Sequence, residues 1–332
     1  MSEFRRDPII GRWVIIDAAR NFDKNIPASE SYPKDVSNCP FCCGNEHMTR
    51  PEILAYTDEK RRSPNSKNWT LRVIPNNKPV LEIEGALKRR AEGMYDKMEG
   101  VGAHEIIIES PDHFAKASSV KSAYYENVSR AGIDRIKDLR NDLRLEYILF
   151  FKNYGIAANA VFEHPYSQLI AMPIIPKRVK EEIEGGKKYF AYKERCVFCD
   201  TISQEISDET RIVSENDLFV AICPYASRYP FETWILPKNH NSDFDCISAK
   251  ELSAYAQISG DVYAKLDRVL DDPAYSVLLH TGPLKERNLQ YYHWHAEVIP
   301  KLTKTSGFEW GTGLYVNPVY PEEAAKYLRE SK

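Results

Sequence analysis

Two sets of cysteines and histidines occur in the same order along the chain, and their residue types and spacing suit a metal ion. The first set is Cys39, Cys42, His113 and His164. The second set is Cys196, Cys199, His240 and His293. Two thiolates and two imidazoles form a four-donor set that favours tetrahedral zinc. Because four protein ligands leave no position for water, we expect two structural zinc sites.

The two sets differ at the residue that lies two positions after the last histidine. The first reads His164-Pro-Tyr166, and the second reads His293-Trp-His295. Residues two apart on a strand point to the same face, so Tyr166 and His295 are expected at equivalent positions. The sequence therefore predicts two related sites with different side chains at one position.

The duplication extends beyond the metal ligands. In each copy a glutamate, Glu105 or Glu232, lies eight residues before the third ligand. In each copy a glycine, Gly155 or Gly282, precedes the final histidine motif. A unit of this size repeated once indicates a tandem domain, because solenoid repeats are about 20–50 residues long. We expect an N-terminal unit over 1–177, a charged linker over 178–192 and a C-terminal unit over 193–332.

Composition narrows the classes of partner and compartment. The chain has 332 residues, a net charge of −3 and 43% hydrophobic residues, which gives no strong nucleic-acid footprint. No apolar stretch reaches the ~18 residues that span a bilayer, and the N-terminus lacks a signal-peptide core. Cysteines in CxxC pairs suit a reducing compartment. The sequence therefore predicts a cytoplasmic protein with no nucleic-acid or membrane partner.

Hydrophobic patterning predicts an α+β fold in which each unit is an antiparallel sheet with one long helix. In the first half we expect a hairpin over 7–17, strands over 69–74, 80–83 and 105–109, and a helix over 118–153. A strand over 168–175 is expected at a sheet edge because of Pro173. In the second half we expect strands over 218–223, 233–236, 275–280 and 295–300, and a helix over 249–270.

Together these motifs resemble the galactose-1-phosphate uridylyltransferase family, a two-copy branch of the histidine-triad superfamily. The resemblance covers nearly the whole chain, including the opening Arg-Asp-Pro-Ile-Ile-Gly-Arg-Trp-Val, Cys-Pro-Phe-Cys, Val-Ile-Pro-Asn-Asn-Lys-Pro and His-Pro-Tyr-Ser-Gln. The C-terminal half, with Tyr-Pro-Phe-Glu-Thr-Trp-Ile-Leu-Pro-Lys-Asn-His, is also similar to plant ADP-glucose phosphorylase. The resemblance implies a zinc-containing homodimer that acts on a nucleotide sugar and a sugar phosphate.

The resemblance also implies a mechanism and a set of site residues. Family members transfer a nucleoside monophosphate between a nucleotide sugar and a hexose 1-phosphate or phosphate, in two steps through a nucleotidylated histidine. Tyr166 stands at that nucleophile position, and Gln168 stands where a glutamine hydrogen-bonds the phosphoryl oxygens. The expected substrate-binding residues are Arg20, Asn76, Asn153, Gly155, Phe308 and Glu309.

The chain departs from the family pattern around the nucleophile. A phenol has a reference pKa near 10, so Tyr166 needs a base or a metal nearby to attack phosphorus. Val161 and Asn159 replace a serine and a glycine of the family pattern, and Asp23 replaces a basic residue near Arg20. Two alternatives to a uridylyltransferase-type enzyme therefore stay open. One is a nucleotide- or sugar-phosphate-binding pseudoenzyme, and the other is a hydrolase or phosphorylase that uses His295. The sequence leaves open whether the base is uracil or adenine, and which sugar is bound.

Overall fold

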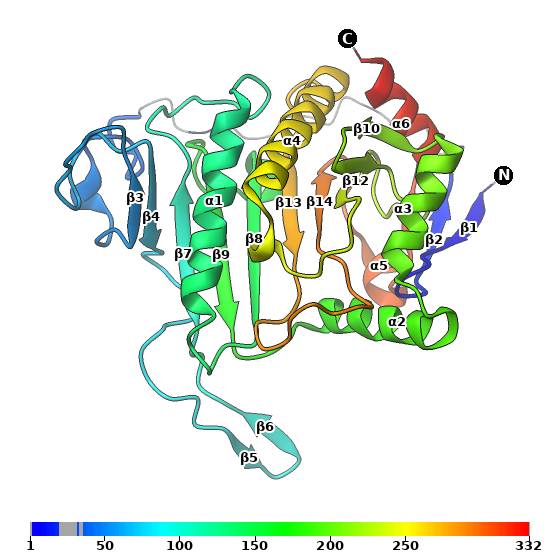
Figure 1. The fold of residues 1–332 in the computed structure, drawn as a ribbon, viewed down its shortest axis with the longest axis horizontal. Coiled ribbons are helices and arrows are strands. Elements are labelled where there is room, and N and C mark those ends of the chain that lie inside the picture. The colour runs from blue at the N-terminus through cyan, green and yellow to red at the C-terminus, as the bar shows by residue number, and fades with distance from the viewer. Residues whose placement is uncertain (1, 20–31, 33–35, 332) are drawn as a thin grey trace.

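One ten-stranded antiparallel sheet forms the centre of the computed structural model, which describes residues 2–19, 32 and 36–331 (Figure 1). The N-terminal half contributes β3 (Leu54–Tyr56), β4 (Leu71–Pro75), β7 (Ala103–Ile108), β8 (Tyr147–Tyr154) and β9 (Tyr166–Met172). The C-terminal half contributes β10 (Ile212–Glu215), β11 (Phe219–Ile222), β12 (Thr233–Pro237), β13 (Tyr275–His280) and β14 (His295–Pro300). The strand order is β10-β11-β12-β14-β13-β8-β9-β7-β4-β3.

The two halves of the sheet have the same internal order. Outward from the junction, one half runs β8-β9-β7-β4-β3 and the other runs β13-β14-β12-β11-β10. A long helix accompanies each half, α1 (Ser122–Leu139) and α4 (Ala249–Leu270), and the two helices lie side by side across one face of the sheet (Figure 1). The predicted duplicated α+β fold, with one long helix per antiparallel sheet, is confirmed.

The core is divided between the two faces of the sheet, because successive strand residues point to opposite sides. On the helix face, Leu169 and Val298 pack with residues of α1 and α4. On the opposite face of the C-terminal half, Val220 and Leu236 pack with α2 (Lys177–Lys193) and α3 (Val197–Asp208). On that face of the N-terminal half, Tyr166 belongs to a separate buried cluster with Cys39 and Phe41.

Smaller elements surround this sheet. A three-stranded sheet combines β1 (Glu3–Arg6), β2 (Trp13–Ile16) and β15 (Tyr315–Asn317). The exposed hairpin of β5 (Arg90–Glu92) and β6 (Tyr95–Lys97) projects from the body (Figure 1). The remaining helices are α5 (Gly307–Thr312) and α6 (Pro321–Glu330), with 3-10 turns at Glu46–Met48, Ile156–Ala158 and Phe244–Cys246. No helix in the described part of the chain combines the length and apolar character needed to cross a membrane.

The helix expected over 118–153 is wrong in its second half. Helix α1 ends at Leu139, and turn hydrogen bonds at Asn141 and Asp142 lead into β8. The segment Tyr147–Tyr154 is rich in aromatic and aliphatic residues that suit both helix and strand spacing, and pairing with β9 and β13 makes it a strand. The strand expected over 80–83 is also wrong, since only an isolated bridge joins Glu82 to Val101.

The edge position expected for the strand around Pro173 is wrong. Strand β9 lies between β7 and β8, well inside the sheet. It ends at Met172, so Pro173 follows the strand and removes no hydrogen bond from it. The same registers place Tyr166 opposite Ile108 and Gln168 opposite Ile106.

The segment 178–192, interpreted as a linker, lies within helix α2. Its two glycines allow close packing, because a Cβ on Gly185 would lie 1.9 Å from the carbonyl oxygen of Ile9. A Cβ on Gly186 would lie 2.2 Å from the carbonyl oxygen of Tyr291. The two glycines thus allow α2 to pack closely on the backbone at Ile9 and at Tyr291. The division into units at 177 and 193 stays a prediction.

We predict that Gly185→Ala destabilises the protein by about 1–3 kcal/mol, because the added methyl group must displace the backbone at Ile9. Gly311→Ala in α5 is the control, since a Cβ there meets nothing within 4 Å. Urea unfolding of both variants measures the difference. Equal stabilities would show that α2 does not depend on this close approach.

Candidate functional site

The first cysteine and histidine set is assembled as the spacing predicts. Sγ of Cys42 lies 3.2 Å from Nδ1 of His113 and 3.6 Å from Nδ1 of His164. Sγ of Cys39 lies 3.8 Å from Nδ1 of His164. In tetrahedral zinc sites with these bond lengths, neighbouring donor atoms are roughly 3.3–3.8 Å apart. The four side chains therefore fit one zinc ion.

The contacts of Nε2 indicate which nitrogen each histidine of this set turns toward the thiols. His164 is fully buried, and its Nε2–H donates to the carbonyl oxygen of Ser110 at 2.8 Å. Nε2 of His113 lies 3.6 Å from Oε2 of Glu163. Both rings therefore turn Nδ1 toward the thiols, as metal-binding histidines commonly do when the other nitrogen is held.

The second set repeats this geometry. Sγ of Cys199 lies 3.4 Å from Nδ1 of His240 and 3.7 Å from Nδ1 of His293. The Nε2–H groups of His240 and His293 donate to the carbonyl oxygens of Leu289 and Pro237, at 3.0 and 2.8 Å. Cys196 completes the four donors, which lie within 4.8 Å of one another. The residues fit a second zinc ion.

Tyr166 lies beneath the first set, in an apolar environment. It is 5% exposed, and its ring centroid lies 5.5 Å from that of Phe41 and 6.2 Å from that of Phe162. Its hydroxyl accepts a hydrogen bond from the backbone N–H of Val161 at 3.1 Å. Burial raises the pKa of the phenol above its ordinary value of 10.0, although the N–H groups of Val161 and Phe162 act in the opposite direction. The phenol is therefore protonated at neutral pH.

His295 occupies the equivalent position on β14 and is 1% exposed. Its ring centroid lies 5.2 Å from that of Phe198 and 5.1 Å from that of Trp234. Nδ1 of His295 lies 3.1 Å from the carbonyl oxygen of His293. Burial and the charge of His280 lower the pKa of His295 to about 4, so the ring is neutral at pH 7.

His295 also belongs to a third group of metal-type side chains that sequence reasoning missed. In the described part of the chain, Glu182, His280, His295 and Glu297 bring one donor atom each within 4.8 Å, and all four are buried. Nδ1 of His280 lies 3.0 Å from Oε2 of Glu182. Arg178 and Arg228 bind the Glu297 carboxylate at 2.7 and 2.8 Å. No short spacing pattern marks this group in the sequence, because Glu182 comes from α2 and Glu297 from β14.

The predicted phosphate and ribose contacts divide into two small networks. Gln168 and Asn76 both lie 3.0 Å from Nε2 of His104, which sequence reasoning did not assign to the site. Asn153 on β8 accepts a hydrogen bond from the hydroxyl of Ser276 on β13 at 3.0 Å. The structure thus brings Gln168 and Asn76 together and places Asn153 at the junction of the two halves.

The loop before the first histidine motif has the backbone of a tight turn. Gly155 has φ +79°, and a Cβ there would lie 2.7 Å from that of Ala274. Asn159 also has positive φ, at 64°, so it adopts the left-handed conformation that glycine favours. Packing thus requires glycine at position 155. The predicted contact of Gly155 with a substrate stays a prediction.

Two further predicted residues lie apart from β9. Phe308 and Glu309 are on α5, which lies beside the C-terminal half of the sheet, whereas β9 lies in the N-terminal half (Figure 1). Oε2 of Glu309 accepts hydrogen bonds from the backbone N–H and hydroxyl of Ser306, at 2.9 and 2.7 Å. Within one chain, therefore, Glu309 caps its own helix. Arg20 lies outside the residues that the structure describes.

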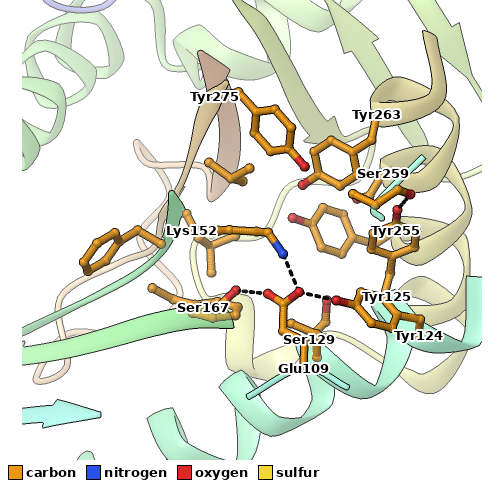
Figure 2. A pocket seen from close by; sticks show the side chains of 16 residues that line it. Glu109, Tyr124, Tyr125, Ser129, Lys152, Ser167, Tyr255, Ser259, Tyr263 and Tyr275 are labelled. Carbon is orange, nitrogen blue, oxygen red and sulfur yellow. Dashed lines mark hydrogen bonds and ion pairs between the residues drawn. The ribbon is translucent and has the colours of Figure 1, made fainter. Parts of the chain in front are cut away.

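Ser167, the residue after Tyr166 on β9, points to the helix face of the sheet, where it donates to the buried carboxylate of Glu109 (Figure 2). Glu109 accepts hydrogen bonds from Ser167 and Tyr124 and pairs with Lys152. These side chains line a cavity of about 60 Å³ between α1 and α4, together with tyrosines of α4 and β13. This network holds β9 from the side opposite Tyr166. Sequence reasoning missed it, because Glu109 was interpreted as the end of a buried strand.

Comparison with known proteins agrees with this arrangement. The model of the galactose-1-phosphate uridyl transferase C-terminal domain matches residues 182–315. ADP-glucose phosphorylase from Arabidopsis thaliana is 36% identical over 340 residues, which cover 99% of this chain and 92% of the relative. The chain belongs to the galactose-1-phosphate uridylyltransferase and ADP-glucose phosphorylase family. Family members of this kind are enzymes that act on nucleotide sugars.

Other members support the same assignment along the whole chain. Galactose-1-phosphate uridylyltransferase from Thermotoga maritima is 28% identical over 344 residues, covering 100% of this chain and 99% of the relative. The crystal structure of the Arabidopsis thaliana ADP-glucose phosphorylase with bound ADP-glucose superposes with a TM-score of 0.85 at 33% identity, and each chain is covered completely.

We predict that the purified protein contains two equivalents of zinc, and that Cys42→Ser and Cys199→Ser each remove one. Loss of a thiolate leaves three donors, which cannot close a structural tetrahedral site. Cys43→Ser is the control, because Cys43 is exposed and outside both sets. Elemental analysis of the dialysed proteins measures the zinc content. Unchanged zinc content in both variants would contradict the assignment.

Proposed function

We propose that the protein is a zinc-containing nucleotidyltransferase that moves a nucleoside monophosphate between a nucleotide sugar and a hexose 1-phosphate or phosphate. The observation that carries the proposal is the arrangement on β9. Tyr166 and Gln168 share one face of this strand, directly after the zinc-type ligand His164. Full-length similarity to a protein whose structure contains bound ADP-glucose supports the same substrate class.

In the proposed reaction the Tyr166 oxygen occupies the nucleophile position. A bond forms between Oη and the α-phosphorus, the bond from phosphorus to the sugar-phosphate oxygen breaks, and the phenol proton is released. The acceptor phosphate then attacks the same phosphorus and frees the tyrosine. Gln168 donates a hydrogen bond to a phosphoryl oxygen as negative charge increases. The zinc ions would hold the loops that shape this site, through the two four-residue sets.

A second candidate function is nucleotide-sugar binding without transfer, and the surroundings of Tyr166 favour it. The Tyr166 hydroxyl accepts a hydrogen bond from the backbone N–H of Val161, and burial raises the pKa of the phenol. Its ring lies in a buried apolar cluster that includes Phe41, Phe162 and Ile108. A protonated phenol is a poor nucleophile, so transfer through Tyr166 is expected to be slow at neutral pH.

The alternative that uses His295 receives less support from the geometry. Its ring is enclosed by Phe198, Trp234 and His280, and it is 1% exposed. A nucleotide phosphate would have to displace this packing to reach the ring. Glu297, two residues further on, places a carboxylate where a phosphoryl group would lie, although Arg178 and Arg228 neutralise it.

We also propose that the working form is a homodimer in which a second copy completes the site. Phe308 and Glu309 would form the sugar side, yet α5 is far from β9 within one chain (Figure 1). In the proposed dimer, α5 of a second copy would approach β9 and supply the sugar side of the site. A cytoplasmic location stays a prediction from the sequence.

We predict that Tyr166→His increases nucleotidyl transfer from ADP-glucose by about 100-fold at pH 7.5, because a neutral imidazole replaces a protonated phenol. Tyr166→Phe should bind ADP-glucose with similar affinity and show no transfer. Calorimetry measures binding, and trapping of a labelled nucleotidyl-protein measures the first chemical step. His295→Ala is the matched test of the alternative. If only this variant lost turnover, the catalytic group would be His295 on β14.

Two results would contradict the proposed function. If neither ADP-glucose nor UDP-glucose binds the wild-type protein, the nucleotide-sugar assignment is wrong. If ADP-glucose binds tightly but Tyr166→His forms no covalent adduct, position 166 is not placed for attack on phosphorus, and transfer through this position is ruled out.

We predict a distinctive pH dependence for any transfer by the wild-type protein. Because the Tyr166 pKa is raised above 10.0, the phenolate is a minor species below that pH and increases tenfold per pH unit. The rate should therefore rise steadily from pH 7 to pH 9. Tyr166→His should show no such rise over this range, since a neutral imidazole is already the reactive form. A flat wild-type profile would show that Tyr166 is not the nucleophile.

A further inference from the structure

His104 lies at the start of β7, on the face of the sheet that carries Tyr166 and Gln168. Register pairs His104 with Ile170 and Ile106 with Gln168, so His104 is the diagonal neighbour of Gln168 on that face. The ring is 9% exposed. Three groups lie within hydrogen-bonding distance of its two nitrogens, namely the Val80 backbone N–H, Gln168 and Asn76.

The contact with Val80 determines the tautomer of the ring. The backbone N–H of Val80 donates to Nδ1 of His104 at 3.2 Å, so Nδ1 must carry a lone pair. A neutral imidazole then has its proton on Nε2. A proton on Nδ1 would instead face the Val80 N–H and leave both donors without an acceptor in a buried place.

This tautomer in turn orients Gln168. Nε2–H of His104 can only donate, and Oε1 of Gln168 lies 3.0 Å away. With its oxygen engaged, the Gln168 carboxamide presents its NH₂ group away from the ring. A freely rotating glutamine would present oxygen and nitrogen about equally, and the oxygen would repel a phosphate. Gln168 is partly exposed, so this NH₂ group is available to a ligand.

Asn76 is oriented by Lys78 and not by His104. Its Oδ1 accepts a hydrogen bond from the backbone N–H of Lys78 at 2.9 Å, which leaves Nδ2 3.0 Å from Nε2 of His104. With a proton on Nε2, these two nitrogens are both donors, and the Asn76 side chain, unlike the Val80 backbone, can rotate away. The tautomer therefore positions Gln168 alone.

We propose that His104 is a positioning residue that turns the Gln168 amide into a hydrogen-bond donor for oxygens of a bound nucleotide. This inference rests on the proposed nucleotide-sugar function. Anionic phosphoryl oxygens accept from a preoriented N–H group without the cost of rotating an amide. His104 acts through Gln168 and has no contact with the reacting atoms in this scheme. If His104 only filled space at the start of β7, an apolar side chain of similar size would replace it.

The first experiment compares ADP-glucose binding to His104→Leu, His104→Gln, Gln168→Leu and the wild-type protein by calorimetry. His104→Leu keeps the bulk but removes both nitrogens, and we expect about tenfold weaker binding from the loss of charge-assisted hydrogen bonds. The glutamine of His104→Gln offers an oxygen to Val80 and an N–H to Gln168, so it should restore at least half of the lost affinity. His47→Leu is the control, because His47 is exposed on a 3-10 turn.

A double variant separates positioning from packing. If His104 acts through Gln168, His104→Leu in a Gln168→Leu background should weaken binding by no more than about threefold. Full additivity of the two tenfold losses would overturn the inference. So would equal binding by His104→Leu and the wild type, or a failure of His104→Gln to restore affinity.

A second measurement does not depend on nucleotide binding. Nitrogen-15 NMR of histidine-labelled protein reports the tautomer of each ring, and the His104→Gln spectrum identifies the His104 signals. We expect a proton on Nε2, and a proton on Nδ1 would overturn the inference. If the wild-type protein binds no nucleotide sugar, the proposed function fails, while the tautomer still decides whether His104 holds Gln168 as described.

Discussion

The antiparallel pairing of β8 with β13 is the constraint on which the rest of the structure depends. It joins Tyr154 to Tyr275 and Phe150 to Leu279, and so converts two five-stranded sheets into one sheet of ten strands. Without this pairing each half would expose an edge strand with unpaired N–H and C=O groups. It also places α1 beside α4 on one face and leaves the other face for the metal-type sets and the candidate site.

Duplication gave the two halves the same framework but different uses. In each half a phenylalanine from the CxxC segment packs on the residue two positions after the last histidine, Phe41 on Tyr166 and Phe198 on His295. The surroundings then diverge. The position on β9 has a backbone N–H donor and a partly exposed glutamine nearby, whereas the position on β14 lies among buried carboxylates and arginines. The position on β14 thus belongs to a buried group of titratable side chains, whereas the position on β9 lies near a partly exposed glutamine.

The candidate site depends on support from behind as well as on its own residues. Glu109 holds Ser167 on the helix face, and His104 contacts Gln168 on the opposite face. Because alternate residues of β9 are held from both sides, the strand has little freedom to shift when a charged ligand binds. Such preorganisation makes hydrogen-bond donors effective toward developing negative charge. Among the described residues, the Tyr166 hydroxyl is hydrogen-bonded to the backbone N–H of Val161, which cannot act as a base.

The sequence by itself determined the duplicated α+β fold, the two cysteine and histidine sets and the family, because ligand types and spacing survive as short local patterns. It also predicted helix 249–270 and most strands of the second half, where apolar periodicity and segment length agree. Only the tertiary structure decided that Tyr147–Tyr154 is a strand, that β9 is internal, and that Glu182 meets Glu297. Those features depend on pairing between segments far apart in the chain. The free energy of that pairing depends on both partners, so it cannot be inferred from one segment alone.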